Sequence, residues 1–287
     1  MAHTFLALAL AAQISGFARP SLLVDTAWLA AHLQDGNVRV VDMRPRGYAD
    51  GHIPGSVWLD NNAIRIPANR PSFLPTPREF EALMGKLGIS NTTRVVVLDE
   101  RGGIYAARLW SILNHFGHDN VALLDGGWVK WEAEKRPVTT AVPSIAAASF
   151  MVKPGTIGVA TAEDVKAAIG TPVKLLDART QGEIDGTDLR NIRRGGFIEG
   201  SIPAYWEDTL DKPALTFKSP QEIEAFWRSK GVGRDASVIT YCQVGMRASH
   251  DLFTLALIGH DLTKMRFYLG SWEDWGNRDD TPIKTSR

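Results

Sequence analysis

Residues 38–44 (VRVVDMR) return later in the chain as residues 173–179 (VKLLDAR). Each segment is a largely apolar, β-branched run that ends in Asp-x-Arg. Such a run predicts a buried strand that opens into a loop. Two strand ends of the same kind in one chain of 287 residues indicate an internal repeat.

Four further segment pairs extend the repeat in the same order along the chain. Their members share turn residues, β-rich runs or tryptophan positions. They are 51–56 (GHIPGS) with 200–205 (GSIPAY), 94–98 (RVVVL) with 237–241 (SVITY), 116–119 (FGHD) with 258–261 (IGHD), and 124–128 (LDGGW) with 268–272 (YLGSW). Five matches in one order predict two copies of one domain.

The chain length suits two α/β domains, each large enough to bury its own core. Short apolar strands alternate with amphipathic helices, so we expect each copy to be a parallel sheet flanked by helices. Capping boxes lie at 76–79 (TPRE) and 219–222 (SPQE). Each predicts the start of a helix that precedes a strand, 94–98 in the first copy and 237–241 in the second. We place the domains at 20–138 and 156–287, joined by an Ala/Ser/Thr/Pro-rich linker at 139–155.

The 32 basic and 32 acidic side chains cancel, so the global charge favours neither a nucleic-acid nor a membrane partner. Residues 1–19 contain an apolar run followed by small residues, which resembles a secretory signal peptide. That run lacks a basic residue ahead of it and is too short to span a bilayer. From the resemblance to a signal peptide we expect a periplasmic or otherwise exported protein, with a cytoplasmic location as the alternative.

The two copies differ chemically after the strands 94–98 and 237–241, where the first has Asp99 and the second Cys242. Cys242 is the single cysteine, so an internal disulfide or a Cys-rich metal site is excluded. It lies between a strand and a helix, where backbone N–H groups favour a thiolate. We identify Cys242 as a reactive nucleophile rather than a buried structural thiol, and the first copy as catalytically silent.

In this arrangement the chain resembles the tandem-domain rhodanese family, which comprises thiosulfate and 3-mercaptopyruvate sulfurtransferases. The likeness covers roughly residues 20 to 284, through the active loop 242–247 (CQVGMR), both Asp-x-Arg ends and the closing 270–276 (GSWEDWG). It implies two rhodanese-like α/β domains and a double displacement. The Cys242 thiolate takes sulfur from a small donor and passes it as a persulfide to cyanide or a thiol, including a protein thiol, without metal or cofactor.

The resemblance also implies roles for residues around Cys242. Arg179 matches the arginine that binds the donor's anionic group, and Arg247 lies in the loop itself. The residues Gln243, Val244, Gly245 and Met246 would form the loop's cradle of N–H groups. Both arginines have an alternative reading as ordinary ion-pair partners.

Three functional alternatives remain at this point. The loop resembles bacterial thiosulfate enzymes, which favours thiosulfate over 3-mercaptopyruvate as the donor. A non-enzymatic persulfide carrier would use the same Cys242. A phosphatase loop needs Cys-x5-Arg, whereas Arg247 comes one residue early, which disfavours that activity.

For His250, in the helix after the loop, a packing role is favoured over a catalytic one.

Overall fold

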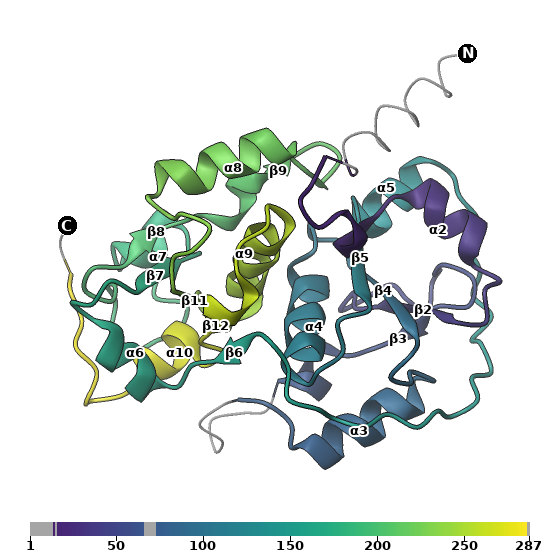
Figure 1. Ribbon diagram of the computed structural model, residues 1–287, viewed down its shortest axis with the longest axis horizontal. Coiled ribbons are helices and arrows are strands. Elements are labelled where there is room, and N and C mark those ends of the chain that lie inside the picture. The colour runs from purple at the N-terminus through teal and green to yellow at the C-terminus, as the bar shows by residue number, and fades with distance from the viewer. Residues whose placement is uncertain (1–13, 15, 66–72, 286–287) are drawn as a thin grey trace.

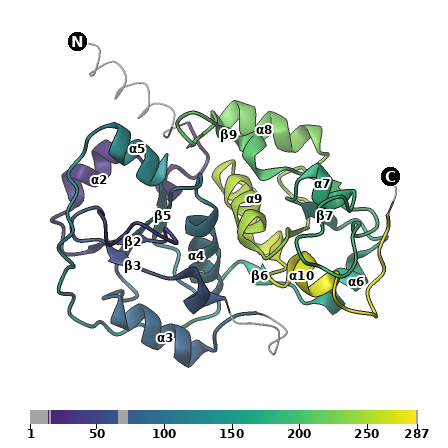
Figure 2. The same ribbon diagram turned by 180° about the vertical axis from the view of Figure 1, so that it is seen from behind.

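The computed structural model describes residues 14, 16–65 and 73–285. The chain forms two lobes that lie side by side, each built on a parallel five-stranded sheet with helices on its faces (Figure 1). Seen from behind, the lobes meet along one pair of helices (Figure 2). This is the α/β tandem architecture that the repeat predicts.

The first sheet has the order β1-β5-β4-β2-β3. Its strands are β1 (Leu23–Val24), β2 (Val38–Asp42), β3 (Val57–Trp58), β4 (Arg94–Leu98) and β5 (Val121–Leu124). The helices of this lobe are η1 (Pro20–Leu22), α2 (Thr26–His32), η2 (Asn61–Ile64), α3 (Pro77–Lys86), α4 (Ile104–His115) and α5 (Gly127–Ala133).

The second sheet repeats this order as β6-β12-β11-β7-β8. Its strands are β6 (Gly158–Val159), β7 (Lys174–Asp177), β8 (Ile202–Pro203), β11 (Val238–Tyr241) and β12 (Met265–Phe267), and a separate antiparallel pair is β9 (Leu210–Asp211) with β10 (Thr216–Phe217). The helices are α6 (Ala162–Ala168), α7 (Gln181–Ile184), η3 (Trp206–Thr209), α8 (Pro220–Ser229), α9 (Met246–Leu257), η4 (Leu262–Lys264) and α10 (Ser271–Trp275).

One of the five segment matches is wrong in its register. The segment 51–56 corresponds to 196–201, not to 200–205. His52 and Phe197 each form the isolated bridge of their lobe, and Val57 and Ile202 pair with matching positions of β2 and β7. The Gly-x-Ile-Pro resemblance is local, and the longer loop before Gly196 in the second copy hides the true alignment.

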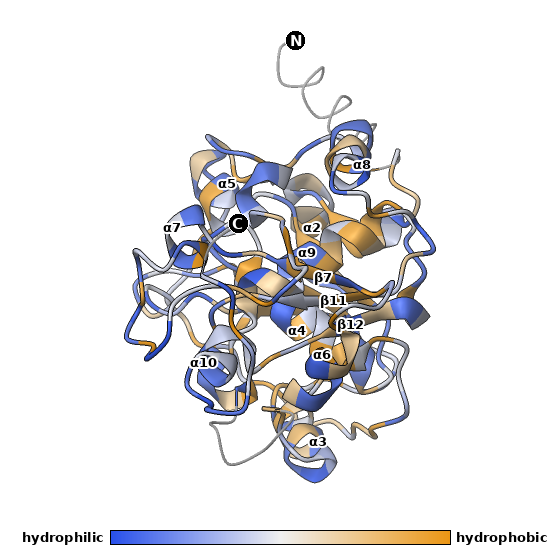
Figure 3. Ribbon diagram, turned by 90° about the vertical axis from the view of Figure 1, so that its left-hand side faces the viewer, coloured by the Kyte–Doolittle hydropathy of each residue, from blue (hydrophilic) through white to orange (hydrophobic). Residues whose placement is uncertain are grey.

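Both predicted capping boxes are confirmed. Thr76 caps α3 and Ser219 caps α8, each with a glutamate at the third helical position that completes the box and with proline at the start of the helix. The central strands β4 and β11 are almost wholly buried, and hydrophilic residues occupy the outer sides of helices such as α3, α6 and α8 (Figure 3). Burial of apolar strands between two helical layers thus fixes both sheets.

The helices α4 and α9 run side by side at the junction of the lobes (Figures 1 and 2). Trp110 packs edge-on against Phe253 with ring centroids 5.1 Å apart. The hydroxyl of Ser111 donates to the hydroxyl of Ser249 across 3.2 Å. The helix α4 follows the loop that begins at Asp99, and α9 follows the loop that begins at Cys242. Packing of these helices therefore brings the two loops toward each other.

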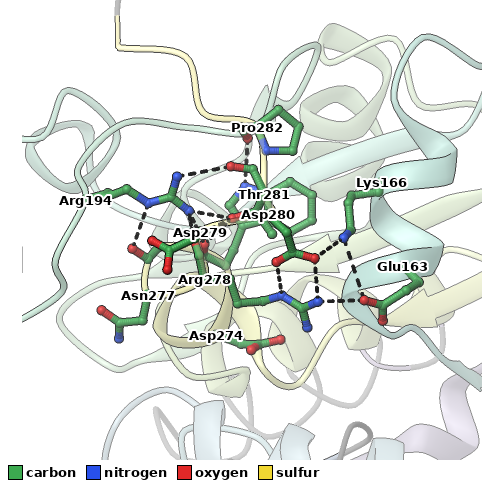
Figure 4. Close-up of polar contacts among 12 residues, drawn as sticks. Glu163, Lys166, Arg194, Asp274, Asn277, Arg278, Asp279, Asp280, Thr281 and Pro282 are labelled. Atoms are coloured by element: carbon green, nitrogen blue, oxygen red, sulfur yellow. Dashed lines mark hydrogen bonds and ion pairs between the residues drawn. The ribbon is translucent and has the colours of Figure 1, made fainter.

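The segment that joins the lobes carries no helix or strand over residues 141–157. It stays attached to the first lobe: the Ala148 N–H donates to the Gly85 carbonyl at 2.9 Å, and Phe150 is buried against Phe80. The C-terminal segment is held by ion pairs (Figure 4) as well as by the backbone bridge between Phe197 and Lys284. Arg278 there bonds both Asp280 and Glu163 of α6.

The expected signal peptide falls largely on residues 1–13 and 15, which lie outside the described residues. Of the remainder, Phe17 is buried, and the Arg19 guanidinium donates to the Ala256 carbonyl of α9 at 2.7 Å. In the part of the chain that the structure describes, no helix is long and apolar enough to cross a membrane.

Candidate active site

Cys242 follows β11 directly and is fully buried. The chain turns back through Gly245, which has φ +85° and is the N-cap of α9. Its N–H donates to the Cys242 sulfur at 3.1 Å. The sulfur therefore lies beside the N-terminus of a twelve-residue helix, where backbone dipoles stabilise negative charge.

Only glycine suits the turn at Gly245. A left-handed φ disfavours other residues, and a β-carbon there would lie 2.9 Å from Nη2 of Arg108 and 3.0 Å from the Leu269 carbonyl oxygen. The close approach of Arg108 brings a side chain of the first lobe against the active loop.

The loop is held from below by the start of α10. The Cys242 N–H donates to the Ser271 hydroxyl at 3.1 Å, and that hydroxyl donates to the Tyr268 carbonyl at 2.8 Å. The Trp272 N–H donates to the Cys242 carbonyl at 2.9 Å. Ser271 adopts a left-handed φ of +51°, so its place under the loop is maintained against backbone strain.

Asp99 occupies the matching place in the first lobe. Its carbonyl accepts from the Trp128 N–H at 2.8 Å, as the Cys242 carbonyl does from Trp272. Its carboxylate accepts four backbone N–H groups at 2.7 to 3.0 Å, from Arg101, Gly103, Tyr105 and Ala106. In the copy without cysteine, this type of loop thus surrounds an acidic side chain with N–H donors, which oppose the rise in the pKa of Asp99 that burial causes.

Arg247, in the first turn of α9, is bound by a carboxylate. Its two terminal nitrogens donate to Glu183 at 2.6 and 2.7 Å, which is a bidentate pair. Burial alone would raise the pKa of Glu183, but the hydrogen bonds and charge of Arg247, together with Thr180, lower it to about 2. The Arg247 charge is therefore locally balanced.

Arg179 is buried beneath the sheet edge. Its guanidinium pairs with Asp177 at 2.7 Å, donates to the carbonyls of Glu183 and Gly196, and lies 4.1 Å from the ring centre of Trp272. The first lobe has the same arrangement, in which Arg44 pairs with Asp42 and stacks on Trp128. An arginine in this place in the silent copy indicates that the Asp-x-Arg signature maintains the fold, and a donor-binding role for Arg179 stays a prediction.

The other loop residues predicted to form the cradle contribute backbone contacts. The Gln243 carbonyl accepts from the Glu273 N–H at 3.0 Å, and the Val244 carbonyl accepts from Arg108 at 2.6 Å. Met246 begins α9. Of the cradle residues, Gly245 is the one whose N–H reaches the sulfur.

Two arginines of the first lobe lie at this loop and are absent from the sequence-based site. Arg108 of α4 is buried and bonds Val244 and Asn61. Arg65, just after η2, pairs with Glu273 of α10. The available signal was an arginine within the largely apolar run at 104–113. No sequence pattern shows which loop of the other domain this arginine contacts.

His250 is fully buried against the rings of Phe217 and Trp206, as the packing alternative expects. Burial lowers the pKa of His250 to about 3, which leaves the ring neutral. Across the described ranges, no three His, Cys, Asp or Glu side chains gather in a way that could hold a metal ion.

Comparison with known proteins identifies the family. The family model for a rhodanese-like domain matches residues 25–134 and 161–278, once in each lobe. The chain belongs to the rhodanese family. The matched ranges lie within the two domains expected from the sequence, whose boundaries remain predictions.

Relatives that match over nearly their full length include proteins named as sulfurtransferases and one named as a sulfur carrier protein. The sulfur carrier protein TtuD of Thermus thermophilus is 34% identical, with 93% of this chain and 98% of the relative covered. A thiosulfate sulfurtransferase of Corynebacterium glutamicum is 31% identical, with 94% and 92% covered. The crystal structure of SseA from Escherichia coli, described as a 3-mercaptopyruvate sulfotransferase, has a TM-score of 0.77 at 26% identity and covers 88% of this chain and 98% of that one.

The two copies differ at this loop. The second domain carries Cys242, the single cysteine of the chain, and the first places Asp99 at the same point. The first domain nevertheless reaches the active loop through Arg65 and Arg108.

Proposed function

We propose that the protein transfers sulfane sulfur from thiosulfate to cyanide or a thiol through a persulfide on Cys242. The observation that carries the proposal is the Gly245 N–H aimed at the Cys242 sulfur at the start of α9. Its counterpart in the first domain, the Asp99 carboxylate in a ring of N–H groups, supports a loop built to hold an anion.

The reaction has two displacements. The Cys242 thiolate attacks the outer sulfur of thiosulfate, a new S–S bond forms, and the old S–S bond breaks with its electron pair leaving on sulfite. Cyanide or a thiolate then attacks the outer sulfur of Cys242–S–S⁻. The products are thiocyanate or a new persulfide, and the Cys242 thiolate is restored.

The choice of thiosulfate rests on the loop residues Gln243, Val244 and Arg247, which resemble those of bacterial thiosulfate enzymes. The Corynebacterium relative carries that activity in its name. The likeness to SseA makes 3-mercaptopyruvate the alternative donor.

The donor is tested by thiocyanate formation with each donor in turn, at equal concentration and with excess cyanide. We expect continuous turnover with thiosulfate and at least tenfold slower turnover with 3-mercaptopyruvate. The Cys242→Ser protein serves as the control and should form no thiocyanate above the rate without protein. Faster turnover with 3-mercaptopyruvate would reassign the donor.

A carrier function is the second candidate because the Thermus relative is named a sulfur carrier protein. Both functions load the same cysteine. A carrier would accept one sulfur per chain and release it to a protein thiol without turnover on small acceptors. The ratio of thiocyanate formed to protein present separates them, since an enzyme exceeds one per chain and a carrier does not.

We also propose that the protein is exported and that residues 1–18 are removed. The apolar run followed by small residues supports this. N-terminal sequencing of protein from its native host should find a start after residue 18, and a start at Met1 would contradict export by this route.

A further inference from the structure

We propose that the first domain supplies the anion site of the shared active centre, where Arg65 and Arg108 bind the charged end of an oxyanionic sulfur donor beside Cys242. The identity of the ligand rests on the proposed sulfur transfer. The argument for an anion rests on charge, burial and geometry alone.

Arg108 is a buried cation with neutral partners. Its Nη1 donates to the Asn61 side-chain oxygen at 3.2 Å and its Nη2 to the Val244 carbonyl at 2.6 Å, while its buried Nε has no partner. Among the described residues no carboxylate pairs with it. Burial lowers the pKa of Arg108 to about 10, so the guanidinium is still charged at neutral pH. A buried charge without a counter-ion is costly, which indicates that an anion joins it in the working protein.

Arg65 brings a second charge to the same loop. It pairs with Glu273, whose N–H holds the Gln243 carbonyl, and its buried Nε is also unpartnered. The Arg65 and Glu273 side chains are 20% and 41% exposed, so this pair lies at the outer rim of the site. An incoming anion can replace Glu273 there.

The two second-domain arginines predicted at the site are each neutralised by a carboxylate. Arg247 is held by Glu183 at 2.6 Å and Arg179 by Asp177 at 2.7 Å. The uncompensated positive charge beside Cys242 therefore comes from the first domain. Burial is the main cause of the lowered pKa of Arg108, and repulsion by the nearby Arg65 lowers it further, whereas the neighbouring Cys242 sulfur acts in the opposite direction.

The chemistry of the donor fits this pair. A guanidinium offers a planar set of N–H donors that matches the oxygens of a sulfonate-like group. When the S–S bond of thiosulfate breaks, its electron pair leaves on sulfite, and the two cations stabilise that developing charge. The domain without the cysteine thus takes part in the reaction.

The test is equilibrium binding of thiosulfate, measured by titration calorimetry in the Cys242→Ala protein, which cannot accept sulfur. Added Arg65→Gln or Arg108→Gln should each weaken binding at least about tenfold, which corresponds to about 1.4 kcal/mol. Glu273→Gln should tighten binding because it removes the competing carboxylate. Arg78→Gln, an exposed arginine of the same domain, should leave binding unchanged.

If Arg108→Gln does not fold, Arg108→Lys and Arg65→Gln carry the test, and the lysine should bind more weakly than arginine. Binding that stays within twofold in the Arg65 and Arg108 variants would overturn the proposal, as would a Cys242→Ala protein that binds no thiosulfate. Thiosulfate binding with the expected arginine dependence, in a protein whose wild type forms no persulfide, would retain the anion site and reject the proposed function.

Discussion

At the scale of single residues, the site depends on Gly245 more than on any side chain except Cys242. Its N–H donates a hydrogen bond to the Cys242 sulfur, and its left-handed backbone turns the chain from β11 into α9. Arg108 and Leu269 fill the space that a side chain would need. Gly245 therefore sets the turn of the backbone, leaves room for the contact with Arg108 of the other domain, and places an N–H group at the sulfur.

We expect Gly245→Ala to destabilise the protein by about 1 to 3 kcal/mol, from the left-handed φ and the contacts of the added methyl group. Sulfur loading should slow as well, because the N–H moves away from the sulfur. Urea unfolding measures the first effect. Gly233→Ala is the matched control, since its β-carbon meets nothing within 4 Å, and it should change stability by less than about 1 kcal/mol. Equal losses in both variants would contradict the account.

Sequence reasoning singles out Cys242 because its signals are local: a strand, a glycine and a helix lie next to it in the chain, and the structure has all three there. It could not rank the arginines in the same way. Arg179 and Arg44 show that the Asp-x-Arg signature repeats in both domains with the same ion pair. Arg65 and Arg108 come from the other domain. Their contacts with the active loop form only when the two domains pack together, so neither segment of sequence predicts these contacts by itself.

At the scale of elements, the two strand-to-helix loops are variants of one design. In the first, the Asp99 carboxylate satisfies four N–H groups at the start of α4. In the second, Cys242 lies at the start of α9 with fewer internal donors. The first loop is thus closed on its own carboxyl group, whereas we propose that the second uses its helix terminus to stabilise negative charge on the Cys242 sulfur.

Asp99→Ala should destabilise the first domain by at least about 2 kcal/mol because buried N–H groups lose their acceptor. Asp50→Ala, at an exposed position of the same domain, should have little effect. Thermal and urea unfolding of both variants would measure the difference. A loss no greater than that of Asp50→Ala would mean that the carboxylate does not hold the loop.

The elements themselves were largely predictable. Capping boxes and β-branched runs act within a few residues, so α3, α8, β4 and β11 lie where the sequence placed them. The register error at 200–205 has a different cause. A short Gly-x-Ile-Pro match cannot reveal a loop of different length, whereas strand pairing of Ile202 with β7 does.

At the scale of the whole molecule, a buried carboxyl group joins the domains. Asp125 follows β5 of the first domain and accepts the Phe217 N–H of the second at 2.9 Å. Burial raises the pKa of Asp125 to about 7, although that hydrogen bond opposes the shift. The folded protein thus holds a proton that the unfolded chain releases at a lower pH.

Stability from this group is present below about pH 4 and is lost as the pH rises toward 7, by up to about 1.4 kcal/mol per pH unit. Asp125→Asn removes this dependence and should gain stability relative to wild type over that range. Urea unfolding of both proteins at several pH values would measure it. A difference between wild type and Asp125→Asn that stays constant with pH would show that Asp125 does not titrate in this way.

The central claim is that Cys242 carries the transferred sulfur, and intact mass spectrometry tests it most directly. Wild type and Cys242→Ala are incubated briefly with thiosulfate and desalted, and their intact masses are measured before and after treatment with cyanide. We predict that wild type gains the mass of one sulfur atom, that cyanide removes it, and that Cys242→Ala gains nothing. A wild type that gains no sulfur, or a Cys242→Ala protein that gains the same mass, would contradict the account.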